Sequence, residues 1–189
     1  PPRPRSYLGP NYGESGYVHV TQADMPLRVA MGTPRSSPKY GSREEARNAA
    51  VEGMRRWERA IRPHVSWFEL EIVTENPEAA VQVEWKRRTV GGAQGRAGVT
   101  CERFGGEWRV GGRMEIAIRE SPTSQPLTID QIRLLVAHEF GHVLGLGHCL
   151  DCDSAMNYAW HTQDRILVTP TDIVTFRELL AKPNACRSP

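Results

Sequence analysis

The chain has 189 residues, a length that fits one domain of ordinary size and leaves little room for a second hydrophobic core. Hydrophobic residues make up 39% and charged residues 24%, a composition typical of globular proteins rather than disordered ones. The net charge of +2 is too small for the electrostatic footprint of a typical nucleic-acid-binding protein, so we expect no nucleic-acid partner. The longest aliphatic run, Leu134 to Ala137, is far shorter than the roughly 20 residues that span a bilayer, so we expect no membrane span.

Residues 1–25 are predicted to form an irregular arm across the surface. Half of the fourteen prolines lie in residues 1–38, among Gly, Ser and Tyr, and such mixtures are typical of loops. Residues 26–189 are then predicted to form a single domain.

A strand and a long helix are predicted to open this domain. Apolar residues alternate over residues 27–31, which indicates a strand. Ser42 and Glu45 then form a capping box, which marks the start of a helix. The helix must end near Arg62, because the residue before Pro63 is disfavoured in helical conformation.

Three further strands are predicted from alternating apolar residues at 68–72, 81–85 and 114–118. Between them, residues 91–112 contain eight glycines, so we expect one strand around Val99 and otherwise a loop or hairpin.

Two helices are predicted in the last third of the chain. The first starts at a capping box formed by Thr128 and Gln131 and ends at Gly145. The second is marked by Thr169 as its cap and Pro170 at its first position. Strands come first and helices last, so the fold class is α+β, with the sheet backed by the first two helices.

Residues 138–148 read HEFGHVLGLGH and carry the chemistry. His138 and His142 are four residues apart on the predicted helix, so both lie on one face and can bind one metal ion. Gly145 can end the helix and turn the chain back, which lets His148 supply a third ligand. Three imidazoles leave the fourth zinc position open for water, as in catalytic rather than structural sites.

Glu139 directly follows the first predicted ligand, so its carboxylate can lie beside a zinc-bound water without binding the metal. Zinc lowers the pKa of that water, and Glu139 is predicted to accept its proton and later deliver it to a leaving amine. The pattern therefore predicts zinc-dependent hydrolysis with Glu139 as general base.

The string resembles the HExxHxxGxxH signature of metzincin zinc peptidases. Met156 follows His148 by eight residues, and that gap together with the order of elements over residues 26–182 resembles the matrixin branch. The resemblance implies a zinc endopeptidase that acts on proteins or peptides and binds substrate along an edge strand. We also expect the chain to be a monomer. It also implies a twisted, mostly parallel sheet with an antiparallel edge strand, a backing helix, an active-site helix, a Met-turn and a C-terminal helix.

The resemblance assigns Met156 to the floor of the metal site rather than to the ligands. Tyr158 lies where several metzincin branches carry a tyrosine that approaches zinc or the oxyanion, and its alternative role is a pocket wall. Two other functions stay open: an archaemetzincin-like peptidase of narrow specificity, and a metal-stabilised binding module without turnover.

The four cysteines are Cys101, Cys149, Cys152 and Cys186. An even number suits an oxidising compartment, so together with the resemblance they predict a secreted protein. We expect a disulfide, either between Cys149 and Cys152 or from these two out to Cys101 and Cys186, because free thiolates there would compete for zinc. The four cysteines of archaemetzincins hold a second zinc, an alternative that the missing second CxxC disfavours. Acidic residues are sparse over residues 86–120, so calcium is not predicted.

Overall fold

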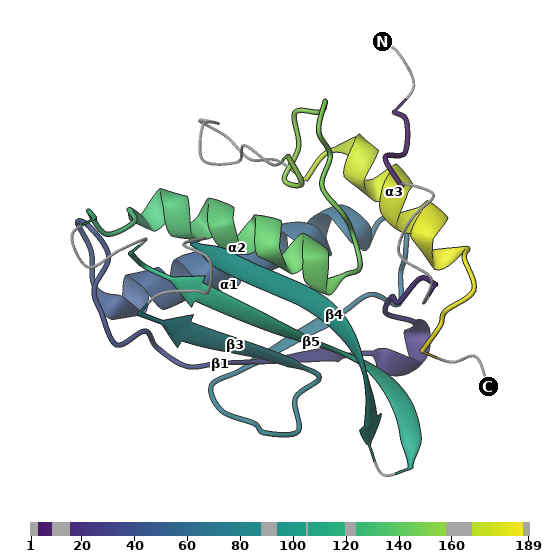
Figure 1. Ribbon diagram of the computed structural model, residues 1–189, viewed down its shortest axis with the longest axis horizontal. Helices are drawn as coiled ribbons and strands as arrows, with labels where there is room; N and C mark the ends of the chain where they lie inside the picture. Colours follow the sequence, from purple (N-terminus) through teal and green to yellow (C-terminus); the bar gives the residue numbers. More distant parts are fainter. Residues whose placement is uncertain are drawn as a thin grey trace.

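The computed structural model describes residues 4–8, 16–87, 94–104, 106–119, 124–157 and 168–186. These residues form one five-stranded sheet and three α-helices (Figure 1). The strands are β1 (Leu27–Met31), β2 (Leu70–Val73), β3 (Val81–Lys86), β4 (Gly95–Phe104) and β5 (Glu107–Ala117). The helices are α1 (Arg43–Ile61), α2 (Ile129–Val143) and α3 (Pro170–Leu180), and a short 3₁₀ turn, η1, covers Gln22–Asp24.

The sheet has the strand order β2-β1-β3-β5-β4. The pairs β1–β2, β1–β3 and β3–β5 are parallel, whereas β4 pairs antiparallel with β5 and forms one edge. The α+β fold with a mostly parallel sheet and an antiparallel edge strand is therefore confirmed.

The glycine-rich region forms a hairpin whose strands are longer than predicted. β5 begins at Glu107, seven residues before the predicted strand at 114–118. Gly111 and Gly112 lie inside β5, where an added Cβ would meet the Ala80 carbonyl oxygen at 3.0 Å and a Val143 methyl at 2.8 Å, respectively. These glycines permit close approach of neighbouring elements, so they do not interrupt the strand.

The predicted helix starts are confirmed at atomic detail. In α1, the Glu45 amide donates to Ser42 Oγ at 3.1 Å and the Ser42 amide donates to Glu45 Oε2 at 2.7 Å. Thr128 and Gln131 make the same reciprocal pair at the start of α2, at 3.2 and 2.9 Å. Each capping box satisfies amide groups that the first turn of a helix leaves without partners.

The helices α1 and α2 lie side by side on one face of the sheet (Figure 1). The core between these layers contains large, fully buried side chains from both helices and from β5, including Trp57, Met114, Leu135 and Phe140. Trp57 also donates its indole N–H to the Ala137 carbonyl oxygen of α2 at 2.6 Å. Packing on one sheet face thus fixes α2 against both α1 and the sheet. Among the described residues, no helix is both long and apolar enough to cross a membrane.

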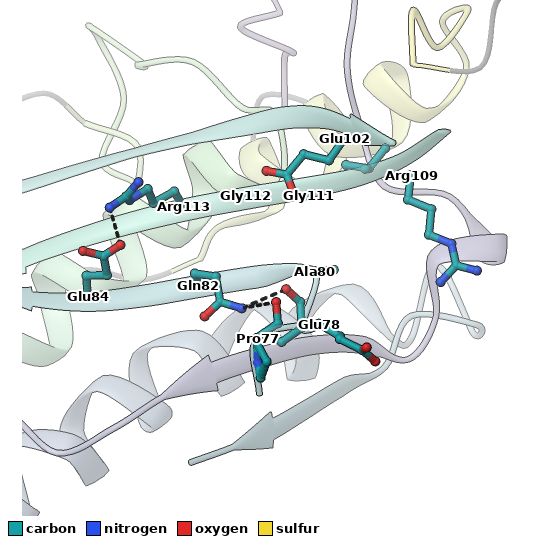
Figure 2. A pocket seen from close by; sticks show the side chains of 12 residues that line it. Pro77, Glu78, Ala80, Gln82, Glu84, Glu102, Arg109, Gly111, Gly112 and Arg113 are labelled. Atoms are coloured by element: carbon teal, nitrogen blue, oxygen red, sulfur yellow. Dashed lines mark hydrogen bonds and ion pairs between the residues drawn. The ribbon is translucent and has the colours of Figure 1, made fainter. Parts of the chain in front are cut away.

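The opposite face of the sheet is polar. A hollow of about 200 Å³ lies there. Figure 2 shows the side chains that line it, among them Glu84 of β3, which pairs with Arg113 of β5. The Gln82 amide closes one side by donating to the carbonyl oxygens of Asn76 at 2.9 Å and Ala79 at 3.1 Å. This hollow lies on the face of the sheet that α1 and α2 leave uncovered.

The described part of the N-terminal arm contacts the C-terminal segment. The Ala185 amide donates to the Tyr17 carbonyl oxygen at 2.8 Å, and the Asn184 side chain donates to the His19 carbonyl oxygen at 2.6 Å. The Tyr7 hydroxyl donates to Asp172 in the first turn of α3 at 2.8 Å. These hydrogen bonds hold the N-terminal arm against α3 and the C-terminal segment.

Candidate metal centre

Three histidines converge at the C-terminal end of α2. His138 and His142 lie one helical turn apart, and their Nε2 atoms are separated by 3.3 Å. The Nε2 atom of His148 lies 3.2 Å from that of His142, and all three ligand atoms lie within 4.8 Å of one another. The predicted ligand set is thus brought together in space.

Gly145 makes the turn that returns His148 to the helix. Its φ is +94°, a backbone conformation that residues with side chains rarely adopt. An added Cβ would also lie 2.5 Å from the Val18 carbonyl oxygen of the N-terminal arm. Both the backbone conformation and the available space therefore require glycine here.

Backbone carbonyls orient two of the rings. His138 Nδ1 lies 2.8 Å from the Ala155 carbonyl oxygen, and His142 Nδ1 lies 2.7 Å from the Leu146 carbonyl oxygen. Because a carbonyl oxygen only accepts, each Nδ1 carries the proton and each Nε2 presents a lone pair. Two lone pairs facing each other at 3.3 Å repel unless a cation lies between them.

The spacing of these nitrogens fits zinc. A tetrahedral ion about 2.0–2.1 Å from each imidazole nitrogen holds its ligand nitrogens roughly 3.3 Å apart. Burial lowers the pKa of His138 to about 3 and that of His142 to about 4, and it also lowers the pKa of His148. All three rings are therefore neutral at pH 7, which is the form that binds a metal ion.

Glu139 lies on the same helix and is buried, with 5% of its surface exposed. Burial raises the pKa of its carboxyl group to about 8, because a charged carboxylate is disfavoured away from water. A dication close by acts in the opposite direction and favours the carboxylate. The protonation of Glu139 is thus coupled to occupation of the histidine site.

Met156 packs against α2, the helix that carries His138 and His142. It is fully buried, and its sulfur lies so close to Gly141 of α2 that a Cβ there would come within 2.1 Å. The Met156 carbonyl oxygen accepts from the Cys149 amide at 2.8 Å, and its amide donates to Ser154 Oγ at 3.0 Å. The same loop supplies the Ala155 carbonyl that orients His138. Tyr158 falls outside the described residues.

All four cysteines are paired. Cys149 forms a disulfide with Cys152 directly after the third histidine, and Cys101 of β4 forms one with Cys186 near the C-terminus. The expected disulfide near the zinc loop is thus the local one. No thiolate is left for a second metal ion, which argues against the archaemetzincin-like arrangement.

Several groups at this site carry no signal in the sequence. The carbonyl oxygens of Ala155 and Leu146 act through the backbone, which is the same for every residue type. Gly95, whose contact with Glu139 is described below, lies 44 residues before it, and only the sheet brings the two together. A glycine in a glycine-rich segment gives no hint of such a contact.

A centre of three histidines, two on a helix packed against a mostly parallel sheet and one on the loop that follows, is typical of zinc metallopeptidases. The chain matches the matrixin family, peptidase family M10, over residues 32–181, and it belongs to that family. A search of curated proteins finds no match to the chain.

Proposed function

We propose that this matrixin is an extracellular endopeptidase in which Glu139 is the general base. The observation that carries the proposal is the convergence of three neutral imidazole nitrogens, with a buried carboxylate on the same helix. His138 and Glu139 are buried, His142 is half-buried and His148 is exposed, so the centre lies at the surface, where a metal ion and a substrate can reach it.

His138, His142 and His148 would hold the zinc ion, which when bound polarises a peptide carbonyl and lowers the pKa of water. Glu139 accepts the proton of the attacking water and delivers it to the nitrogen of the leaving amine, which breaks the peptide bond. Met156 supports the histidines from below through its contact with Gly141. Its loop also orients His138 through the Ala155 carbonyl.

The substrate would be an extended segment of a protein or peptide, and the chain would act as a monomer. Two disulfides support an oxidising, extracellular location. Independence from calcium stays a prediction, which a calcium-selective chelator added to the activity assay tests.

The experiment is digestion of an unfolded protein by the zinc-loaded chain and by Glu139→Gln, with the products identified by mass spectrometry. Glutamine keeps the volume of the side chain but cannot accept the proton. The matched control is Glu75→Gln, which makes the same charge change at an exposed position. We expect internal cuts by the parent and by the control, none by Glu139→Gln, and none after zinc is chelated.

The alternatives give different results in the same assay. A binding module would hold one zinc per chain and cut nothing, whereas a peptidase of narrow specificity would remove only terminal residues. Internal cutting that survives in Glu139→Gln would refute the assignment of the base.

A further inference from the structure

Gly95, the first residue of β4, lies against the carboxylate of Glu139. A Cβ built at Gly95 would be 2.3 Å from Oε1, 2.6 Å from Cδ and 2.7 Å from Cγ of Glu139. Two of these atoms belong to the carboxylate, and the third is the Cγ atom next to it. The space in which the carboxylate lies is therefore the space that any other residue at position 95 would fill.

Neither backbone at this contact is free to withdraw. Gly95 is in register with Ile116 of β5, and the Ala117 amide donates to the Gln94 carbonyl oxygen at 2.8 Å. On the other side, α2 is fixed by the core packing described above. A side chain at position 95 would therefore displace the carboxylate of Glu139 rather than the strand or the helix.

We propose that Gly95 is a positioning residue for the general base: by lacking a side chain, it leaves the slot between β4 and α2 that holds the Glu139 carboxylate. The proposal rests on the role of Glu139 proposed above. A second glycine on the same strand gives a comparison, because a Cβ at Gly98 would meet nothing within 4 Å.

The test compares Gly95→Ala with the parent chain under zinc-loaded conditions, with kcat and KM measured on one peptide. We expect kcat to fall about 100-fold, since a base displaced by about an ångström loses most of its contribution. KM should change less than about 2-fold, because the flexible end of Glu139 yields before the site does.

Two controls separate positioning from folding. Gly32→Ala lies away from the site, where a Cβ meets only a carbonyl oxygen at 4.0 Å, and should leave activity unchanged. Gly95→Ala should keep one zinc per chain and the Tm of the parent. Loss of zinc or a large fall in Tm would overturn the proposal, because Gly95 would then serve the fold.

These outcomes are distinct from failure of the proposed function. If the parent chain cuts nothing, the endopeptidase assignment fails. If the parent cuts, Glu139→Gln does not, and Gly95→Ala keeps its full kcat, only the role of Gly95 is wrong.

Discussion

Gly53 lies at a close contact between α1 and α2, and we expect Gly53→Ala to separate the two helices. A Cβ at this position would lie 2.6 Å from the Arg133 carbonyl oxygen and 3.0 Å from the Ala137 amide nitrogen. Both contacts are backbone atoms of α2, which cannot rotate away as a side chain can. The helices have to recede by about 0.8 Å to restore ordinary contact with the carbonyl oxygen.

The cost follows from what lies around this contact. Overpacking of a dense core destabilises by about 1–3 kcal/mol. The Trp57 indole, whose hydrogen bond to Ala137 is 2.6 Å long, lies one turn further along α1, and stretching that bond adds about 1 kcal/mol. The higher helix propensity of alanine over glycine acts in the opposite direction and raises the free energy of unfolding by about 1 kcal/mol. We therefore expect a net loss of about 1–3 kcal/mol in the free energy of unfolding.

Chemical denaturation of the zinc-loaded protein measures this loss, and a thermal scan should show a Tm lower by roughly 2–12 °C. Asn48→Ala, at an exposed position of the same helix, reports the gain in helix propensity alone. If Gly53→Ala is as stable as the parent or more stable, backbone contact does not set the helix spacing and the reasoning is wrong.

Three further predictions concern stability. Glu58 is buried and accepts from the Leu70 amide at 2.8 Å, so Glu58→Ala should lower the free energy of unfolding by about 1–3 kcal/mol in urea titrations, because that amide loses its partner. Burial raises the pKa of Asp172, against the lowering effect of its hydrogen bonds, so the folded state holds this proton more tightly than the unfolded state. Asp172 therefore contributes to stability below about pH 4, and this contribution is lost as pH rises through the raised pKa. Over that pH range the free energy of unfolding should fall with pH in the parent chain and fall less steeply in Asp172→Asn. Free zinc at 100 times its Kd should stabilise the chelated protein by about 2.7 kcal/mol, and equal melting curves with and without zinc would contradict the metal site.

Local patterns predicted the helix starts and the convergence of the three histidines. A capping box such as that of Ser42 and Glu45 involves only four consecutive residues, and the structure contains it as predicted. The spacing of His138 and His142 follows from the helical period, and the return of His148 follows from the one glycine that permits the turn. These features depend on short stretches of chain, where sequence and geometry are closely linked.

Long-range features could not be predicted in the same way. The early start of β5 follows from close contacts of Gly111 and Gly112 with elements far away in the sequence, whereas glycine alone indicates a loop. The cysteine pairing likewise depends on how the hairpin meets the C-terminus, and composition leaves three pairings open. Such features depend on tertiary contacts, which cannot be deduced from a single sequence.

Glycines surround α2 and explain how its chemistry is held in place. Gly53 of α1 contacts its backbone, Gly95 of β4 contacts Glu139, and Gly112 of β5 contacts Val143. From within the helix, Gly141 makes room for Met156. At each of these glycines, a neighbouring element contacts α2 without an intervening side chain. The position of the helix, and with it that of the histidines and Glu139, therefore depends little on side-chain rotamers.

This close packing has an energetic consequence. His138 and Glu139 are almost fully buried, and polar groups in such surroundings destabilise a fold when they lack a partner. Apolar residues on the same helix, among them Leu135 and Phe140, supply the burial that keeps α2 in place. Zinc in this site would offset the free-energy cost of burying these polar groups, because the three histidines come together only in the folded chain. The site and the fold should therefore be stabilised together by zinc, and a substitution that moves α2 should weaken both.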